Sequence, residues 1–321
     1  MKIISNIKSK DKSGLHPRNK HRSQYDFSQL TSVCSDLKQF ISKNKYNTET
    51  IDFTNDLAVK TLNQALLKQF YNIEHWDIPK KYLCPPIPGR VDYIHNIADV
   101  LSLSNSGIIP KGKSVHVLDI GVGANCIYPL LGHQVYDWQF VGTDSDLLAV
   151  KVATQIIESN SLSNYIEIRH QKNTDSIFNG VLKPQEVFDI TMCNPPFHSS
   201  AKEAQAGTEK KWKNLGYIKT VKPVLNFGGQ NSELWCNGGE VVFITKMVEE
   251  SSKIQDSSLW FTSLVSKSNS LPSIYFALKK AGAVSIKTIN MTQGNKVSRM
   301  VAWTFLNDMQ HIQWSLKRWK D

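Results

Sequence analysis

Residues 117–125 read VLDIGVGAN, an apolar run that ends in an acid and a turn containing two glycines, with a helical pattern directly after it. At such a junction an open α/β sheet binds its ligand, and Gly121 and Gly123 let the backbone approach where a β-carbon would collide. The dinucleotide spacing of three glycines is absent, because Cys126 stands at the third position. This disfavours a nucleotide-dependent dehydrogenase, and we expect Asp119, Gly121 and Gly123 to contact another ligand.

The chain around and downstream of this turn alternates short β-branched runs with helical patterns, which is typical of a doubly wound α/β sheet. Seven strands are predicted, at residues 115–120, 139–143, 166–169, 188–193, 259–265, 284–290 and 300–306. Helices are predicted at residues 125–131, 146–160, 239–251 and 271–281. We therefore expect a seven-stranded Rossmann-like domain over residues 111–321.

Upstream of residue 103 the apolar spacing suits helices. One run recurs at three- and four-residue intervals through Phe27, Leu30, Val33, Leu37 and Ile41. A second run lies at residues 57–70, a third helix is expected near 93–101, and residues 105–113 resemble a linker. The expected organisation is a basic arm at residues 1–24 and a helical, substrate-binding module at 25–110, followed by the α/β domain.

The bulk composition narrows the class of protein. Lysine and arginine outnumber aspartate and glutamate by 38 to 28, for a net charge of +10, which favours a polyanionic partner; the alternative, to which charge alone gives equal weight, is a solvated, disordered basic arm. The five cysteines form no C-x-x-C pair, so we expect reduced thiols and no metal site. No apolar run approaches the roughly 20 residues of a membrane span, and no signal-peptide pattern follows Met1. We therefore expect a cytoplasmic protein.

A second acid, Asp144, ends the next predicted strand, about twenty residues after the glycines, where it can bind both hydroxyls of a ribose. The alternative is that Asp144 caps the following helix, a role that Ser145 or Asp146 could equally fill.

The four residues Asn194, Pro195, Pro196 and Phe197 follow the apolar strand at 188–193. In this position they resemble the motif of methyltransferases that modify a nitrogen conjugated to a π-system, with S-adenosylmethionine as the methyl donor. Asn194 would accept one N–H and the Pro195 carbonyl the other, while Phe197 would stack on the target. The structural alternative is a stiff loop. His198 is interpreted as a loop residue. The motif alone fits adenine N6, cytosine N4 or a glutamine side chain.

The rest of the chain resembles one family, the large-subunit ribosomal RNA adenine-N6 methyltransferases of the RlmF type, related to eukaryotic spliceosomal-RNA adenine methyltransferases. The resemblance extends from Leu15 to Trp303, through the stretches at residues 85–95, 226–230 and 238–247. It implies a class I S-adenosylmethionine-dependent fold and N6-methylation of one adenine in 23S ribosomal RNA, either free or in a large-subunit assembly intermediate. It also implies a monomer, and an Arg90 that pairs with the methionine carboxylate of the cofactor.

Two rival functions are considered. The first is a protein glutamine N5-methyltransferase acting on a release factor, which would have little use for the basic arm. The second is an RNA-binding module without catalysis, which an intact motif at residues 194–197 makes a poorer interpretation.

Several basic residues are candidates for RNA contact. In the arm, they are Arg18, Lys20, His21 and Arg22, and a floppy tail anchored by Tyr25 and Phe27 is the alternative. The long loop at residues 199–227 is interpreted as a substrate-handling lid, with Lys202, Lys210, Lys211, Trp212 and Lys213 as candidates. Residues 314–320 either touch RNA or cap the sheet. Glu240 is expected to complement a helix dipole, with substrate orientation by Glu240 or Lys246 as the alternative.

Overall fold

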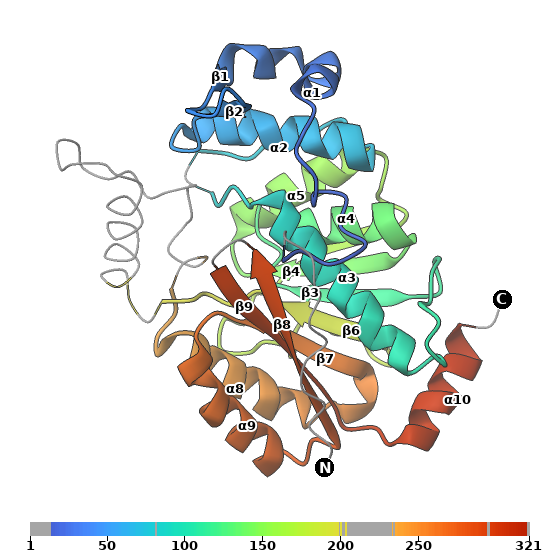
Figure 1. Ribbon diagram of the computed structural model, residues 1–321. Helices are drawn as coiled ribbons and strands as arrows, with labels where there is room; N and C mark the ends of the chain where they lie inside the picture. Colours follow the sequence, from blue (N-terminus) through green and yellow to red (C-terminus); the bar gives the residue numbers. More distant parts are fainter. Residues whose placement is uncertain are drawn as a thin grey trace.

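A computed structural model describes residues 14–80, 82–198, 200, 203, 233, 235–293 and 296–319. Its centre is a seven-stranded sheet with the strand order β5-β4-β3-β6-β7-β9-β8 (Figure 1). The strands are β3 (His116–Ile120), β4 (Gln139–Asp144), β5 (Ile166–His170), β6 (Phe188–Cys193), β7 (Ser258–Val265), β8 (Ser285–Gln293) and β9 (Lys296–Thr304). Pairing is parallel from β5 to β7, and β9 runs antiparallel to β7 and β8. The predicted Rossmann-like sheet is confirmed.

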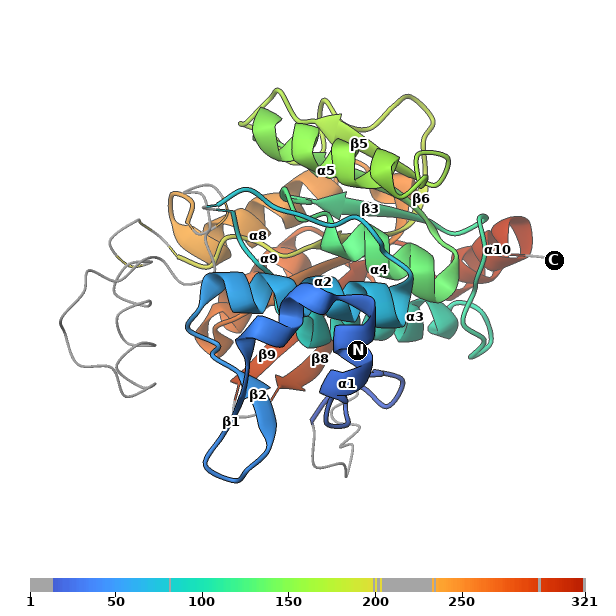
Figure 2. The same cartoon turned by 90° about the horizontal axis from the view of Figure 1, so that it is seen from above.

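Helices cover both faces of the sheet (Figures 1 and 2). On one side lie α3 (Ile87–Leu103), α4 (Ile127–Tyr136) and α5 (Leu147–Ser159), and on the other lie α8 (Gly239–Ser251) and α9 (Leu271–Lys280). The helix α8 has the predicted bounds. The strand β6, which leads into the motif, is buried at all of its six residues, as expected for a strand covered on both faces.

The first predicted helix is wrong in its second half. The helix α1 (Phe27–Val33) begins where the Asp26 carboxylate caps its first amides, and a 3-10 helix, η1 (Ser35–Phe40), follows it. Ile41 opens a hairpin of β1 (Ile41–Lys43) and β2 (Glu49–Ile51). The hairpin forms because the Asn44 side chain accepts the amides of residues 46 and 48, closing a tight turn.

The helix α2 (Asp56–Tyr71), capped by Asn55, completes this amino-terminal module, and its buried face continues into the core of the α/β domain. In the same core, Tyr93 of α3 contacts β6 and β7 through its hydroxyl group. The helix α3 therefore joins the module and the sheet. The division of the chain at residue 110 stays a prediction.

The amino edge of the parallel strands is closed by α10 (Asp308–Arg318), a helix that the sequence did not predict. The Asp189 side chain on β6 is fully buried and accepts hydrogen bonds from Trp314, Arg318 and Trp319. It also accepts the His116 amide of β3, at 2.6 Å. Of the two roles left open for residues 314–320, these three residues adopt the sheet cap.

Among the described residues, no helix is long and apolar enough to cross a membrane. Nor does the described part of the chain gather three or more His, Cys, Asp or Glu residues that could hold a metal ion.

Candidate active site

The turn after β3 has the open backbone expected of a ligand cradle. Gly121 and Gly123 adopt left-handed conformations, with φ of 75° and 64°. A β-carbon on Gly121 would project into open space, while one on Gly123 would lie 3.2 Å from the Asn125 amide nitrogen. Cys126, at the position of the missing third glycine, is buried with φ of 50° and begins α4. The turn thus suits a ligand at the carboxyl-terminal edge of the parallel strands.

Asp119 is the unusual group in this turn. Its side chain is fully buried, and neither carboxylate oxygen has a hydrogen-bond partner within the described structure. Burial, together with the nearby charge of Asp144, raises the pKa of Asp119 to about 8, while Arg90 opposes the shift. Buried carboxylates are normally paired, because an unpaired one costs several kcal/mol. An orphaned acid at a strand end therefore suits a cationic ligand group.

Asp144 is held in place by backbone amides rather than by the helix after it. Its two carboxylate oxygens accept the amides of Gly123 and Asp146, each at 2.9 Å. The cap of α5 is Asp146, whose side chain accepts the Leu148 amide. The capping alternative for Asp144 is therefore wrong, and its carboxylate is fixed beside the glycine turn. Burial raises the pKa of Asp144 above its ordinary value.

Arg90 lies in the first turn of α3, and its guanidinium donates a hydrogen bond to the Tyr128 hydroxyl of α4. The same guanidinium lies 5.4 Å from the centre of the Tyr128 ring. Its Nε is buried and has no partner among the described residues. An arginine with one free buried donor suits a carboxylate ligand.

The predicted motif begins beside this turn, one strand away. In the register of β3 and β6, Ile120 pairs with Cys193, so Gly121 and Asn194 follow at adjacent strand ends. The Asn194 side-chain oxygen is buried without a partner in the described structure. Pro195 is buried, and Phe197 is half-buried. The structure thus brings the motif and the glycine turn to one edge, and the orphaned amide oxygen is free to accept an N–H.

A strap at residues 72–86 crosses from α2 to α3, and the sequence analysis missed its contacts with the site. The Trp76 indole donates to the Asn125 carbonyl in the turn, at 2.9 Å. The Tyr82 hydroxyl donates to the Asp146 carboxylate, at 2.6 Å, and the Asn160 side chain accepts the amides of residues 74 and 75. No local pattern in the sequence indicates these partners, because they lie far from the strap along the chain.

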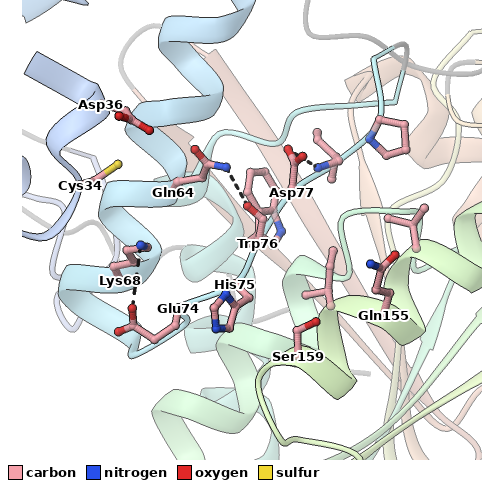
Figure 3. A pocket seen from close by; sticks show the side chains of 14 residues that line it. Cys34, Asp36, Gln64, Lys68, Glu74, His75, Trp76, Asp77, Gln155 and Ser159 are labelled. Carbon is pink, nitrogen blue, oxygen red and sulfur yellow. Dashed lines mark hydrogen bonds and ion pairs between the residues drawn. The ribbon is translucent and has the colours of Figure 1, made fainter. Parts of the chain in front are cut away.

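A cavity of about 540 Å³ lies between α2, the strap and α5 (Figure 3). Three of the charged side chains that line it form ion pairs, Asp77 with Lys60 and Lys68 with Glu74. None of the predicted site residues lines this cavity. We place the site at the strand ends instead, because the orphaned buried polar groups are there.

The arm residues predicted to clamp phosphates are not equivalent. The Arg18 guanidinium donates to the Asp99 carboxylate at 2.6 Å, to the His95 carbonyl and to the Tyr136 hydroxyl, so it ties the arm to α3 and α4. His21 is buried, with its ring nitrogens 2.8 Å and 3.1 Å from two tyrosine hydroxyls. For these two residues the structure shows an anchoring role.

Lys20 is exposed, with Nζ 3.3 Å from the Phe70 carbonyl, and Arg22 reaches the Pro17 carbonyl. Phosphate contact by the arm stays a prediction, as it does for Lys211 and Lys213. Those two lie outside the described residues, together with Lys202, Lys210, Trp212 and nearly all of the loop at 199–227.

Glu240 has a more specific role than a helix dipole alone requires. Its carboxylate is buried and accepts the Ser266 amide and hydroxyl and the Lys267 amide. The residue therefore joins the start of α8 to the end of β7.

Comparison with known proteins extends these observations. The profile of an RNA methyltransferase family matches residues 9–307. A ribosomal RNA large subunit methyltransferase F from Photobacterium profundum is 52% identical over 98% of this chain and 98% of its own length. The protein of the same name from Flavobacterium johnsoniae is 56% identical over 94% of this chain and 97% of its own.

Solved structures agree with the fold. The catalytic domain of human METTL16 in complex with a MAT2A 3′UTR hairpin has a TM-score of 0.79 and 28% identity, covering 92% of this chain and 97% of that one. The METTL16 amino-terminal domain in complex with SAH has a TM-score of 0.72 and 25% identity, covering 91% and 99%. The resemblance inferred from the sequence is confirmed, and the chain belongs to the RNA methyltransferase family.

Proposed function

We propose that the protein transfers the methyl group of S-adenosylmethionine to N6 of one adenine in 23S large-subunit ribosomal RNA. The observation that carries this proposal is a set of orphaned buried groups at one sheet edge: the Asp119 carboxylate, the Arg90 Nε and the Asn194 amide oxygen. An anion, a cation and an amine acceptor together match the cofactor's methionine part and an exocyclic amino group. The names of the relatives supply the ribosomal RNA.

The residues at the strand ends fit the cofactor. Asp119 would take its ammonium group, Arg90 its carboxylate, and Asp144 the two ribose hydroxyls. The open backbone at Gly121 leaves room for close approach. One of the solved relatives carries SAH. When bound, S-adenosylmethionine supplies a methyl group on a sulfonium, an electrophile that needs no further activation.

The motif would orient the attacking nitrogen. The lone pair of an adenine amino group is delocalised into the ring, so the site must favour a pyramidal nitrogen pointing at the methyl group. The Asn194 oxygen would accept one N6–H and the Pro195 carbonyl the other, while Phe197 would stack on the base, for about 1 to 3 kcal/mol. After in-line transfer the amine is cationic and loses a proton readily, so a strong base is not required.

RNA is favoured over a release-factor glutamine as the substrate. The net charge of +10 suits a polyanion, and the relatives reported above are ribosomal RNA methyltransferases by name. The binding-only alternative is disfavoured because the buried side-chain oxygens of Asp119 and Asn194 have no partner among the described residues, as a site for a cofactor and an amine would require. We infer that the protein acts as a cytoplasmic monomer on 23S RNA or on an assembly intermediate of the large subunit.

The test uses isotope-labelled cofactor with the full-length protein. Bulk RNA from cells that lack the gene, and total protein from the same cells, serve as parallel substrates. We expect label in 23S RNA as N6-methyladenosine. Label in a protein fraction, with unlabelled RNA, would transfer the assignment to the glutamine rival.

A further inference from the structure

The strand β6 stops pairing with one of its two neighbouring strands just before the motif. Its pairing with β3 continues to Cys193, whereas its pairing with β7 ends at Thr191 opposite Phe261. Backbone groups released from a ladder inside a core must find other partners, since an unsatisfied buried amide costs about 1 to 3 kcal/mol. The end of β6 therefore needs a substitute for β7 at the point where the chain enters Asn194.

Two side chains provide that substitute. The Tyr93 hydroxyl oxygen lies 3.3 Å from the Cys193 amide nitrogen and 2.8 Å from the Thr262 hydroxyl. The Thr262 hydroxyl donates to the Thr191 carbonyl, at 2.8 Å. Side chains of helix α3 and strand β7 thus supply the hydrogen bonds that strand pairing no longer supplies at the end of β6.

The proton directions in this bridge follow from the acceptors. The Thr191 carbonyl can only accept, so it takes the single Thr262 proton, and Thr262 then accepts the Tyr93 proton at 2.8 Å, with the Cys193 carbonyl as a second, longer acceptor at 3.3 Å. The Tyr93 oxygen is left as the acceptor for the Cys193 amide. The chain runs Cys193 N–H to Tyr93 to Thr262 to the Thr191 carbonyl, so it starts and ends on β6. Burial raises the pKa of the Tyr93 phenol, so the hydroxyl keeps its proton throughout the working pH range.

The same helix reaches the other half of the site. Arg90 precedes Tyr93 by three residues, which places both side chains on one face of α3. The fully buried Tyr93 ring packs edge-on against Tyr128, at 5.4 Å between ring centres, and Tyr128 accepts the Arg90 hydrogen bond. Helix α3 therefore contacts the residue before Asn194 and also carries the arginine assigned to the cofactor.

We propose that Tyr93 is a positioning residue for the methyl transfer: its hydroxyl lies 3.3 Å from both the amide nitrogen and the carbonyl oxygen of Cys193, fixes the backbone on both sides of this residue and so sets the direction of the two oxygen acceptors at Asn194 and Pro195. This inference rests on the proposed function of Asn194. It goes beyond it because Tyr93 would act through the backbone of Cys193 and not on the cofactor or the base. A rigid peptide matters because a small misplacement of an acceptor weakens transition-state binding without weakening ground-state binding.

The test compares Tyr93→Phe with the unsubstituted protein under single-turnover conditions. We expect the rate of transfer to fall about tenfold, with the affinity for S-adenosylmethionine changed less than twofold. Ser251→Ala is the matched control, because it also removes a buried, doubly bonded hydroxyl, but on the far face of the sheet. It should lower thermal stability and leave the rate unchanged. Equal rates in Tyr93→Phe and the unsubstituted protein would overturn the proposal.

Thr262→Val provides an independent readout should Tyr93→Phe fold poorly. It removes the acceptor of the Tyr93 proton, leaving the phenol in place, and we expect a threefold to tenfold lower rate. The double variant should be no slower than Tyr93→Phe, because both changes break one chain. Multiplicative losses, or losses confined to cofactor affinity, would contradict a positioning role. If the unsubstituted protein transfers no label to RNA, the proposed function itself fails. A failure of the positioning role is different, because it is detected from the rates of the variants relative to an active unsubstituted protein.

Discussion

Two buried aspartates on neighbouring strands have opposite surroundings. Asp189 of β6 and Asp119 of β3 are both fully buried. Asp189, at the amino edge, accepts five hydrogen bonds, from the His116 amide, two tryptophan indoles and two nitrogens of Arg318. Asp119, at the carboxyl edge, accepts none from the described residues. One carboxylate is saturated by the protein itself, and we propose that the other pairs with a ligand.

The difference teaches where this fold places stability and where it places chemistry. In parallel strands, the carboxyl ends meet loops that can vary without disturbing the sheet. The amino ends here are closed by α10 and carry no open polar group on Asp189. The comparison predicts that identical substitutions at the two positions separate stability from ligand binding.

The largest effect is expected for Asp189→Asn. This change removes the negative charge beside Arg318 and weakens the five hydrogen bonds that the carboxylate accepts. The free energy of unfolding should therefore fall by about 3 to 5 kcal/mol. The matched control is Asp119→Asn. At pH 7 the folded Asp119 is protonated while the unfolded one is ionised, so a neutral residue there should leave stability unchanged or slightly raised. Urea unfolding measures both, and similar losses would erase the distinction.

The next effect concerns the orphaned oxygen on Asn194. Asn194→Ala removes one acceptor for the target amine, and the rate of transfer should fall about 10²- to 10³-fold, as for the loss of one oriented hydrogen-bonding group elsewhere. Affinity for the cofactor, measured by calorimetry, should stay nearly constant. Asn105→Ala, in the loop after α3, serves as a control with unchanged rate. A large loss of cofactor affinity in Asn194→Ala would contradict its assigned role.

A smaller effect is expected from pH. Below about pH 8, Asp119 must lose its proton to bind an ammonium group, so cofactor affinity should rise up to about tenfold per pH unit as the pH increases. Above roughly pH 8, the α-amino group of the ligand is itself deprotonated, and affinity should fall again. Calorimetric titrations from pH 6 to 9 would show a maximum near pH 8, and Asp119→Asn should flatten its acid limb. A persistent limb in that variant would assign the titration to another group.

The smallest effect separates two arm residues in the same way. Lys20 is exposed, whereas Arg18 is committed to Asp99 and Tyr136. Lys20→Ala should reduce the slope of log K against log salt for RNA binding by roughly one, without altering stability. Arg18→Ala should lower the free energy of unfolding by about 1.5 to 3 kcal/mol. Unchanged slopes in Lys20→Ala would remove Lys20 from the phosphate contacts.

Much of this architecture could be predicted from local patterns. Buried strands such as residues 117–120 and 188–193 are rich in apolar residues, and the glycine turn and Asn194 follow directly after them. Asp144 could be placed because the strand position and its distance from the glycines agree. These features depend on residues near one another in the chain.

The contacts that could not be predicted join distant residues. Arg18 was interpreted as a candidate for phosphate contact, but the structure pairs it with Asp99, which lies 81 residues away in the chain. Tyr93 lies in the stretch at residues 85–95 that carries the family resemblance, but its hydrogen bond to Cys193 joins residues that are 100 positions apart. The short hairpin at residues 41–51 was not predicted, because Ile41 continues the apolar spacing of α1. The helix does not extend that far, since the Asn44 side chain closes a turn there.

The tie between Arg318 and Asp189 also has a consequence for how the molecule is assembled. It links positions 129 residues apart, so it must close late, after the local helices and hairpins have formed. A nascent chain on the ribosome would bury the β6 carboxylate without its counter-charge until α10 emerges. We therefore expect partly synthesised chains to be kept loose and chaperone-accessible at this edge, and maturation to be completed by the docking of α10.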